Sequence, residues 1–209
     1  SAIKELGTTN LATYAYDALT RRIVRAVGAE DPVHTYWSNQ WKPLEERVGA
    51  DTDPERQYVW GARPGHRDEL ILRDRDRTGD GTLDERLYAT MDYFNATGAL
   101  DADGDVVERY AYSAFGGRRV MAPDFTPRAA STVDWAFAFQ GQFLDPETGY
   151  YDYGYRYDSS RLGRWLGKDP LQVQYDINRY QAFSNNGVNS IDLFGLKTYS
   201  PDETFDSVD

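Results

Sequence analysis

The chain has 209 residues, with 23 Lys and Arg against 34 Asp and Glu, which gives a formal net charge of −11. This length suits one all-β domain or two small domains, and the acidic balance argues against nucleic acid and anionic membranes, whose phosphates it would repel. The absence of cysteine excludes a disulfide scaffold, a thiolate metal site and a cysteine nucleophile, and no apolar run is long enough to span a membrane.

Short runs of alternating apolar and polar residues recur through residues 10–121. A period of two residues is typical of strands that bury one face, and the gaps between the runs hold Asp, Gly, Asn and Pro, which favour turns. We therefore expect most of this region to be antiparallel sheet. The runs are residues 11–16, 22–27, 34–37, 56–60, 69–73, 86–91 and 106–112.

A tyrosine motif recurs within these runs. Tyr14 and Tyr16 precede Asp17, a turn and a basic pair, and a weaker copy of the motif begins at Tyr110 and Tyr112. Such repetition suggests hairpins stacked along an axis, each too small to bury its own face. A coincidental meander of strands is the alternative interpretation.

The later part of the chain begins with an irregular connection. Residues 122–135 hold two prolines and small polar residues, which favours a domain boundary near 121–134. Strand-like alternation returns in residues 135–140 and 150–157, and a turn that contains Pro and Gly joins these runs. Only residues 176–184 favour a short helix.

A series of specific motifs follows the tyrosine repeats. The motifs are Phe143-Leu144-Asp145-Pro146-Glu147-Thr148-Gly149-Tyr150-Tyr151, Tyr155-Arg156-Tyr157, Leu162-Gly163-Arg164-Trp165, Lys168-Asp169-Pro170, Asn178-Arg179-Tyr180, Asn185-Asn186-Gly187-Val188-Asn189 and Asp192-Leu193-Phe194-Gly195-Leu196. In order and spacing they resemble the RHS repeat-associated core domain, and the tyrosine repeats resemble the C-terminal repeats of an RHS/YD-repeat protein. The fold expected is all-β: an antiparallel YD-repeat hairpin sheet, part of a spiral β-shell, capped by the core domain.

Such proteins, as the resemblance implies, wind YD-repeat strands into a hollow shell around a variable C-terminal segment, commonly a toxin. Residues 1–121 would then be the YD-repeat region, 122–196 the core domain and 197–209 the start of the cargo. The expected partners are the rest of the shell and the chain's own C-terminal segment, with no nucleic acid and no membrane span. Open sheet edges would also permit self-association. The resemblance implies a bacterial protein that is secreted or lies at the cell surface.

The core domain is also similar to a self-cleaving aspartic protease, which cuts after its terminal Asp-x-x-Gly-Leu motif. The resemblance places the two carboxylates at Asp169 and Asp192 and a supporting guanidinium at Arg156. It places the scissile bond between Leu196 and Lys197. No cofactor is expected for this cleavage.

The sequence departs from the family pattern at three places. Leu193 replaces the usual Pro after the second Asp, which removes a fixed φ before the predicted cut. Asp158, Ser159 and Ser160 replace the usual Tyr-Asp-Pro, and Thr20 stands where the first repeat normally has Gly. These departures bear on cleavage efficiency more than on the fold.

Without Cys and without an obvious Ser-His-Asp arrangement, a metal or a carboxylate pair must activate the water for peptide hydrolysis. Two neighbouring carboxylates share one proton, so that one acts as base and the other as acid. Asp192 lies four residues before Leu196, and a tight turn with Gly195 at positive φ would present the bond to this carboxylate. Arg156 would lower the pKa of the nearer Asp and hold a carbonyl or carboxylate. Alternatively, Asp169 and Asp192 are ordinary turn residues and Arg156 forms a surface ion pair.

A second candidate site is an acidic loop with the spacing of a calcium ligand set. Counting from Asp74, oxygen-bearing side chains fall at positions 1, 3, 5, 7, 9 and 12, and Gly79 holds position 6, where such a loop turns sharply. The flanks are strand-like, so we expect a Ca²⁺ loop between two strands rather than an EF-hand. A solvated acidic turn is the alternative. The candidate ligands are Asp74, Asp76, Thr78, Asp80, Thr82 and Glu85.

The function expected from this pattern is encapsulation with one self-cleavage after Leu196, which releases a C-terminal toxin-like segment. The first alternative is a non-catalytic structural or adhesive cell-surface module that calcium stabilises, and Leu193 mildly favours it. A carbohydrate-binding β-module is a third reading, but the Trp and Tyr residues form no localised platform in the sequence.

Overall fold

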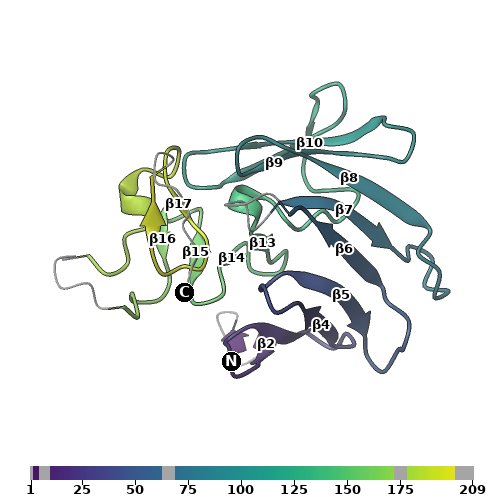
Figure 1. Cartoon of the computed structure of the whole chain (residues 1–209), viewed down its shortest axis with the longest axis horizontal. Helices are drawn as coiled ribbons and strands as arrows, with labels where there is room; N and C mark the ends of the chain where they lie inside the picture. Colours follow the sequence, from purple (N-terminus) through teal and green to yellow (C-terminus); the bar gives the residue numbers. More distant parts are fainter. Residues whose placement is uncertain (1, 5–9, 63–68, 172–177, 201–209) are drawn as a thin grey trace. The chain divides into compact units, whose positions relative to one another are not determined.

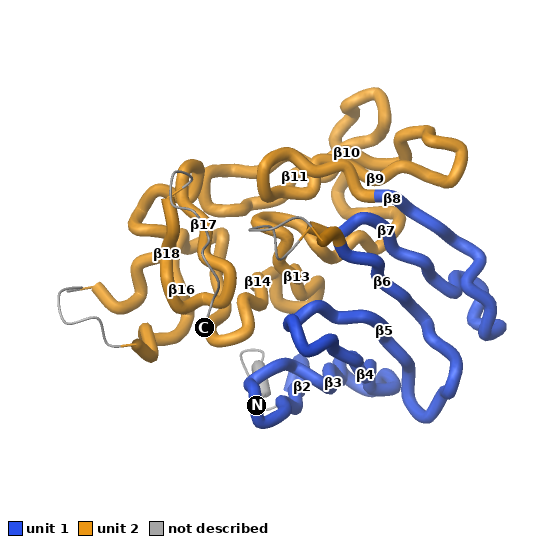
Figure 2. The backbone as a smooth tube through the Cα atoms, viewed as in Figure 1, with its two compact units in different colours: residues 1–60, 70–88 blue, residues 61–69, 89–209 orange. Residues whose placement is uncertain are grey.

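The structure is a computed structural model that describes residues 2–4, 10–62, 69–171 and 178–200. It divides into two compact units, one of residues 1–60 and 70–88 and the other of residues 61–69 and 89–209 (Figure 2). Strands dominate both units and the described ladders are antiparallel (Figure 1), so the prediction of an all-β fold is confirmed. Among the described residues no helix is long and apolar enough to cross a membrane.

The first unit is a meander in which strands pair in chain order. Strand β8 (Glu85–Met91) begins in this unit and ends in the second one. The alternation predicted for residues 10–91 is therefore confirmed as antiparallel sheet. The remaining strands of the unit are β1 (Ala2–Lys4), β2 (Asn10–Tyr16), β3 (Arg22–Val27), β4 (Val33–Trp37), β5 (Pro43–Val48), β6 (Arg56–Trp60) and β7 (Leu70–Arg75).

The second unit combines longer strands with a set of very short ones. Its longer strands are β9 (Ala96–Leu100), β10 (Val106–Tyr112) and β11 (Arg118–Met121), followed by the two-residue strand β12 (Pro127–Arg128). A four-stranded sheet then contains β13 (Phe143–Leu144), β14 (Tyr151–Asp152), β15 (Tyr157–Ser159) and β16 (Arg164–Trp165). A final hairpin pairs β17 (Ile191–Asp192) with β18 (Thr198–Tyr199).

The tyrosine motif builds the same tight turn in both units. In the first unit, Thr20 N–H donates to the carbonyl of Asp17 at 3.1 Å, and in the second unit Gly116 N–H donates to the carbonyl of Ser113 at 3.0 Å. Thr20 has φ +66° and Gly116 has φ +82°, so the third position after the Asp or Ser is left-handed in both turns. This conformation explains why glycine is favoured at the position that Thr20 occupies.

The basic residues after each turn also play the same part in both units. The Arg22 guanidinium lies 4.9 Å from the ring centre of Tyr14, and the Arg118 guanidinium lies 5.6 Å from that of Tyr110. Both tyrosines are buried. The motif is therefore a local packing unit, in which a cation covers the ring that its hairpin buries.

The short strands of the second unit surround an aromatic core. Tyr153 and Trp165 meet edge to face, with ring centres 4.9 Å apart and an interplanar angle of 90°. These rings replace the aliphatic residues of an ordinary sheet core and bury more area per residue. The buried cluster consists of Ala138, Phe139, Tyr151, Tyr153, Trp165, Ala182 and Phe183.

The short helix expected at residues 176–184 is wrong over residues 178–184, which form no α-helix. Residues 176 and 177 lie outside the described ranges. Residues 183–185 form instead a single 3-10 turn, η2 (Phe183–Asn185). All three of its residues have positive φ, between 51° and 58°, which no α-helix tolerates. The buried Phe183 ring packs into the aromatic core, and this packing outweighs the local helix preference.

The predicted boundary at residue 121 does not coincide with the division into compact units, which falls after Trp60 and Tyr88. The residues on its two sides pair with each other, since Met121 lies opposite Pro127 in the ladder between β11 and β12. The assignment of 1–121, 122–196 and 197–209 to repeat, core domain and cargo stays a prediction.

Candidate functional site

Asp192 lies at the end of β17, at the start of a tight link to β18. Its side chain is fully buried, and its Oδ1 atom accepts the backbone N–H groups of Phe194 at 3.2 Å and Leu196 at 3.0 Å. Gly195 has φ +69°, and a Cβ atom there would lie 3.1 Å from the backbone nitrogen of Arg156. The link therefore folds back over its own carboxylate, as the sequence predicted, and glycine permits the close approach.

Arg156 connects the two predicted catalytic carboxylates. Its Nη1 atom lies 2.9 Å from Asp169 Oδ2, and its Nη2 atom lies 3.5 Å from Asp192 Oδ2. Its Nε–H donates to the carbonyl of Gly195, and its guanidinium lies 4.4 Å from the centre of the Trp165 ring. The side chain is buried rather than at the surface, so the planar fork is held on three sides.

Asp169 supplies the more accessible carboxylate, with 20% of its side chain exposed against 1% for Asp192. Its Oδ1 atom accepts the backbone N–H of Leu171 at 2.9 Å, and its backbone N–H donates to the carbonyl of Arg179 at 3.0 Å. The structure thus brings Asp169, Asp192 and Arg156 together from separate segments. Their catalytic role stays a prediction.

The buried position of Asp192 changes its acidity. Burial raises the pKa of Asp192 to about 6, although the Leu196 N–H and the Arg156 guanidinium act in the opposite direction. Asp192 is therefore largely protonated in mildly acidic solution, as an acid catalyst requires. The two carboxylates meet on one guanidinium, each through its own nitrogen atom.

The predicted scissile bond lies in the link between β17 and β18. Leu196 N–H is bonded to Asp192, and the carbonyl that Arg156 holds belongs to Gly195, one residue before Leu196. Lys197 follows, with its ammonium group 4.7 Å from the ring centre of Tyr199. The predicted cut therefore falls within the turn that Arg156, just before β15, and Asp192, on β17, both contact, and residues 198 and 199 pair with β17.

Two buried polar residues of the second unit escaped the sequence reasoning. Gln140 contacts the backbone of β17, and Asp158 lies in the four-stranded sheet opposite Tyr151 and Trp165. Burial raises the pKa of Asp158 to about 7, and the adjacent Ser159 N–H offsets this only in part. Among the described residues neither carboxylate oxygen of Asp158 has a hydrogen bond of normal geometry. Gln140 ends the alternating run 135–140 and Asp158 follows the run 150–157, but nothing in these runs marks either residue as buried and polar.

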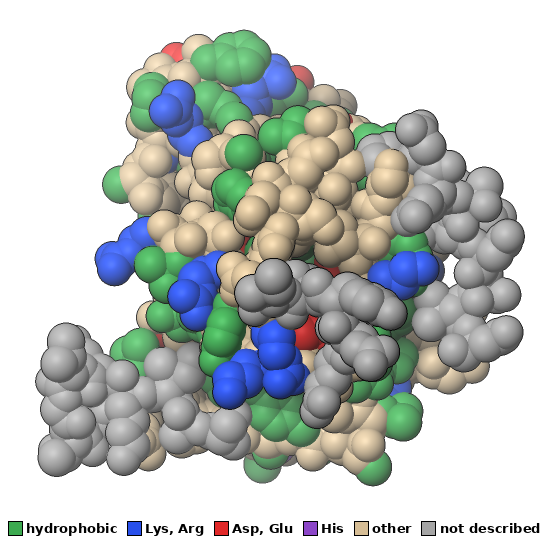
Figure 3. Space-filling view, turned by 90° about the vertical axis from the view of Figure 1, so that its left-hand side faces the viewer, with side chains coloured by type: hydrophobic (Ala, Val, Ile, Leu, Met, Phe, Trp, Pro, Cys, Tyr) green, Lys and Arg blue, Asp and Glu red, His purple; other side chains and the backbone are tan. Residues whose placement is uncertain are grey.

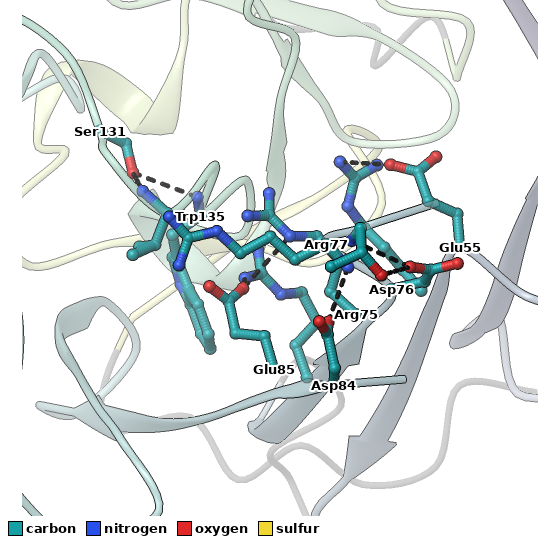
Figure 4. A network of polar contacts seen from close by, with 12 residues as sticks. Glu55, Arg75, Asp76, Arg77, Asp84, Glu85, Ser131 and Trp135 are labelled. Atoms are coloured by element: carbon teal, nitrogen blue, oxygen red, sulfur yellow. Dashed lines mark hydrogen bonds and ion pairs between the residues drawn. The ribbon is translucent and has the colours of Figure 1, made fainter. Parts of the chain in front are cut away.

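The acidic loop connects β7 and β8 in the first unit, and its central carboxylate is used by the loop itself. Asp76 accepts the backbone N–H groups of Thr78 at 3.1 Å, Gly79 at 2.6 Å and Gly81 at 2.7 Å. In the same loop Arg77 N–H donates to Asp84 Oδ1 at 2.8 Å (Figure 4). Slight desolvation acts to raise its pKa, but these hydrogen bonds outweigh it and lower the pKa. Gly79 has φ +76°, in agreement with the sharp turn predicted at this position.

The candidate ligands at the two ends of the loop are held by arginines. Asp74 forms a two-pronged ion pair with Arg86, with both distances 2.7 Å. Glu85 lies 2.5 Å from Arg73 Nη2 and 3.2 Å from Arg75 Nε. Within the described ranges, no group of three or more His, Cys, Asp or Glu residues is placed to hold a metal ion. Calcium binding by Asp74, Asp76, Thr78, Asp80, Thr82 and Glu85 therefore stays a prediction that requires these ion pairs to open.

The loop also borders a groove of about 580 Å³ in the first unit. Acidic side chains on its lining are Asp51, Asp53, Glu55, Asp76 and Asp80, with Arg77 as the basic member. The acidic balance of the chain is not uniform, however. Figure 3 shows one face of the molecule, on which several Lys and Arg side chains and few Asp or Glu side chains are visible.

Comparison with known proteins gives related toxin subunits. The chain is 25% identical over 198 residues to toxin subunit YenC2 of Yersinia entomophaga, which covers 88% of the chain and 19% of YenC2. It is 32% identical over 114 residues to toxin subunit YenC1 of the same organism, which covers 54% of the chain and 11% of YenC1. The chain therefore spans a fifth or less of these relatives. No protein-family model matches it.

Solved structures with the same fold come from Tc toxins. A structure of the Photorhabdus luminescens Tc holotoxin pore matches 93% of the chain and 9% of its own chain, with a TM-score of 0.63 and 19% identity. A crystal structure of TcdB2-TccC3 matches 93% of the chain and 10% of its own, with a TM-score of 0.62 and 20% identity. The chain thus shares the antiparallel all-β fold of these Tc toxin structures, and its similarity to YenC1 and YenC2 supports the RHS/YD-repeat type.

Proposed function

We propose that the chain is the C-terminal part of an RHS-type encapsulating shell protein of a secreted bacterial toxin, and that it cuts its own backbone after Leu196. The similarity to toxin subunits supports the shell assignment, although the chain spans at most 19% of the first relative. The single observation that carries the cleavage is the Arg156 fork, which joins Asp169 and Asp192 beside the turn that contains the bond. The released segment would begin at Lys197.

The proposed reaction is a single-turnover hydrolysis. Asp169, the more accessible carboxylate, takes a proton from a water molecule whose oxygen attacks the Leu196 carbonyl carbon. Asp192 holds a proton below its pKa of about 6 and donates it to the Lys197 nitrogen as the C–N bond breaks. Leu196 becomes a new C-terminal carboxylate and Lys197 a new amine. Arg156 offsets the negative charge that develops in the turn.

The test is the intact mass of the purified chain during incubation between pH 5 and 7. Cleavage removes the 13 residues 197–209, and the variants Asp169→Asn and Asp192→Asn are expected to stay whole. Asp124→Asn is the matched control, because Asp124 is an exposed turn residue of the same unit and is expected to leave cleavage unchanged.

Wild-type chain that remains whole after long incubation would reject the protease assignment. A product that begins at Leu196 instead would move the scissile bond to the carbonyl that Arg156 contacts. The shell assignment is tested separately on the longer parent protein, in which the C-terminal segment is expected to resist added protease until the shell is opened.

A second candidate function is a structural or adhesive module without catalysis, stabilised by calcium. The observation that favours it is the Oδ1 atom of Asp192, which caps the turn through Phe194 and Leu196 as an ordinary turn residue would. In that case wild type and Asp192→Asn both stay whole, and the substitution only weakens the fold. Intact mass of wild type beside that of Asp192→Asn separates the two functions, since the protease proposal requires that wild type is cut and the variant is not.

A further inference from the structure

Gln140 occupies a strained and buried position in the second unit. It lies in η1 (Phe139–Gly141) with φ 52° and ψ 27°, a left-handed conformation that is uncommon for a residue with a long side chain. Only 3% of the residue is exposed, and its backbone N–H donates to Asn95 Oδ1 at 3.0 Å. Backbone strain of this kind persists where surrounding contacts require it, which directs attention to the side chain.

The side-chain amide of Gln140 is bonded to the strand that carries Asp192. Its Nε2 donates to the carbonyl of Ser190 at 2.9 Å, and its Oε1 accepts the backbone N–H of Asp192 at 3.1 Å. These two backbone groups flank Ile191, and a neighbouring parallel strand would bond the same pair. The side-chain amide of Gln140 thus makes the two hydrogen bonds that a residue of a neighbouring strand would make with β17. The strand β18 also pairs with β17, with Thr198 opposite Asp192.

The same oxygen atom also connects β17 to the segment that carries Arg156. The Tyr153 hydroxyl donates to Gln140 Oε1 at 3.2 Å, and Tyr153 N–H donates to the carbonyl of Arg156 at 3.1 Å. One amide oxygen therefore joins the segments that hold Asp192 and Arg156. The contact between those two side chains is 3.5 Å, so a small displacement of either segment would break it.

We infer that Gln140 is a positioning residue for the proposed self-cleavage: its amide fixes the backbone of Asp192 relative to Tyr153 and so sets the contact between Asp192 and Arg156. This inference rests on the proposed function. It assigns Gln140 no contact with the reacting atoms. Misplacement of a catalytic group by about 1 Å is enough to slow a reaction by about 100-fold.

The decisive variant is Gln140→Asn. Asn adopts the left-handed conformation more readily than Gln, so the backbone strain of η1 is relieved, while the amide becomes one methylene shorter and loses its partners on β17. Cleavage is expected to slow by about 10- to 100-fold. Gln57→Asn is the matched control, because it shortens an amide bonded to Glu45 in the other unit and is expected to cleave at the wild-type rate.

Gln140→Glu provides a second readout through its pH profile. The variant keeps the length of the side chain but loses the donor to Ser190, unless its carboxyl group carries a proton. Its cleavage is expected to approach the wild-type rate only as the pH falls. The Tyr153 hydroxyl is the titratable group in contact with position 140, and the Asp192–Arg156 pair adjoins it through the backbone N–H of Asp192. A merely space-filling role would leave the pH profile unchanged.

Amide hydrogen exchange tests the inference without relying on cleavage. In whole chain carrying Asp169→Asn, the added Gln140→Asn change is expected to speed exchange at Asp192 and Leu196 and to leave β10 protected. A wild-type chain that never cleaves would reject the proposed function but not this inference, because amide exchange at Asp192 still shows whether Gln140 holds the backbone of β17. Unchanged exchange at Asp192, wild-type cleavage by Gln140→Asn, or faster exchange throughout the unit would each overturn the inference.

Discussion

The two acidic sites of the chain treat their carboxylates in opposite ways. In the first unit Asp76 is half-buried, and backbone N–H groups lower its pKa, while arginines neutralise Asp74 and Glu85 at the ends of the loop. In the second unit Asp192 and Asp158 are fully buried, and burial raises their pKa values to about 6 and about 7. Carboxylates of the first kind hold a turn in shape, whereas the second kind retain protons near neutral pH and suit acid catalysis.

The largest effect on the buried site is expected from loss of Arg156, which contacts both of its predicted catalytic carboxylates. Arg156→Met removes the guanidinium that lies between Asp169 and Asp192, so we expect cleavage to fall by about 100-fold or more. The second unit is expected to lose about 3–5 kcal/mol of stability, because a buried ion pair loses its cation. Intact mass and denaturant unfolding measure the two effects. Arg164→Lys is the control, and normal cleavage by Arg156→Met would remove Arg156 from the mechanism.

The acidity of Asp192 predicts the pH dependence of cleavage. Asp192 must carry its proton, so the rate is expected to fall about tenfold for each pH unit above the pKa of about 6. The decline should therefore lie between pH 6 and 8, on the alkaline side. Time courses of intact mass at fixed ionic strength measure it. A rate that rises with pH through this range would assign the proton to another group.

The buried Asp158 predicts a pH-dependent stability. Its pKa in the folded state, about 7, lies above the ordinary value of 3.8, so the folded state holds this proton more tightly than the unfolded chain. The stabilisation is therefore fully present below pH 3.8 and is lost as the pH rises through 7. Asp158→Asn stays neutral and is therefore expected to stabilise the second unit by about 4 kcal/mol at pH 8, with little gain at pH 4. Urea unfolding at both pH values checks this. Equal effects at the two pH values would show that Asp158 does not titrate in this range.

The smallest expected effect belongs to the acidic loop. We expect weak Ca²⁺ binding, with a dissociation constant near 1 mM, because Asp74 must first leave Arg86. At about 10 mM Ca²⁺ such binding stabilises the fold by about 1.4 kcal/mol. Arg86→Gln frees Asp74 and is expected to tighten binding. Calorimetric titration, with Mg²⁺ as the control ion, measures both. Absence of heat in wild type and in Arg86→Gln would leave the loop as a solvated turn.

Part of the fold was predictable because its signals are local. Alternation in β2, β3 and β10 and the turn residues between them follow from neighbouring residues alone. The strand β5 escaped prediction because it carries Glu45, Glu46 and Arg47, which break the alternation. Glu46 is buried there only because Arg56 lies 3.2 Å away and the Tyr58 hydroxyl 3.1 Å away on the next strand.

The candidate site was predictable only through its motifs. The resemblance gave Asp169, Asp192 and Arg156, and the structure brings these residues together. Gln140 lies about 50 residues from the strand that it positions, so no local pattern relates the two. The acidity of Asp158 likewise depends on burial between two neighbouring strands rather than on its sequence neighbours.

The amino-acid sequence alone determined the all-β class, the tight turn after the tyrosine motif and the absence of thiol chemistry, since each depends on residue type and short-range spacing. Only the tertiary structure decided which carboxylates are buried, which are neutralised by arginine and which face the turn after β17. Burial and long-range contact set the pKa of an acid, and both arise when distant segments pack together.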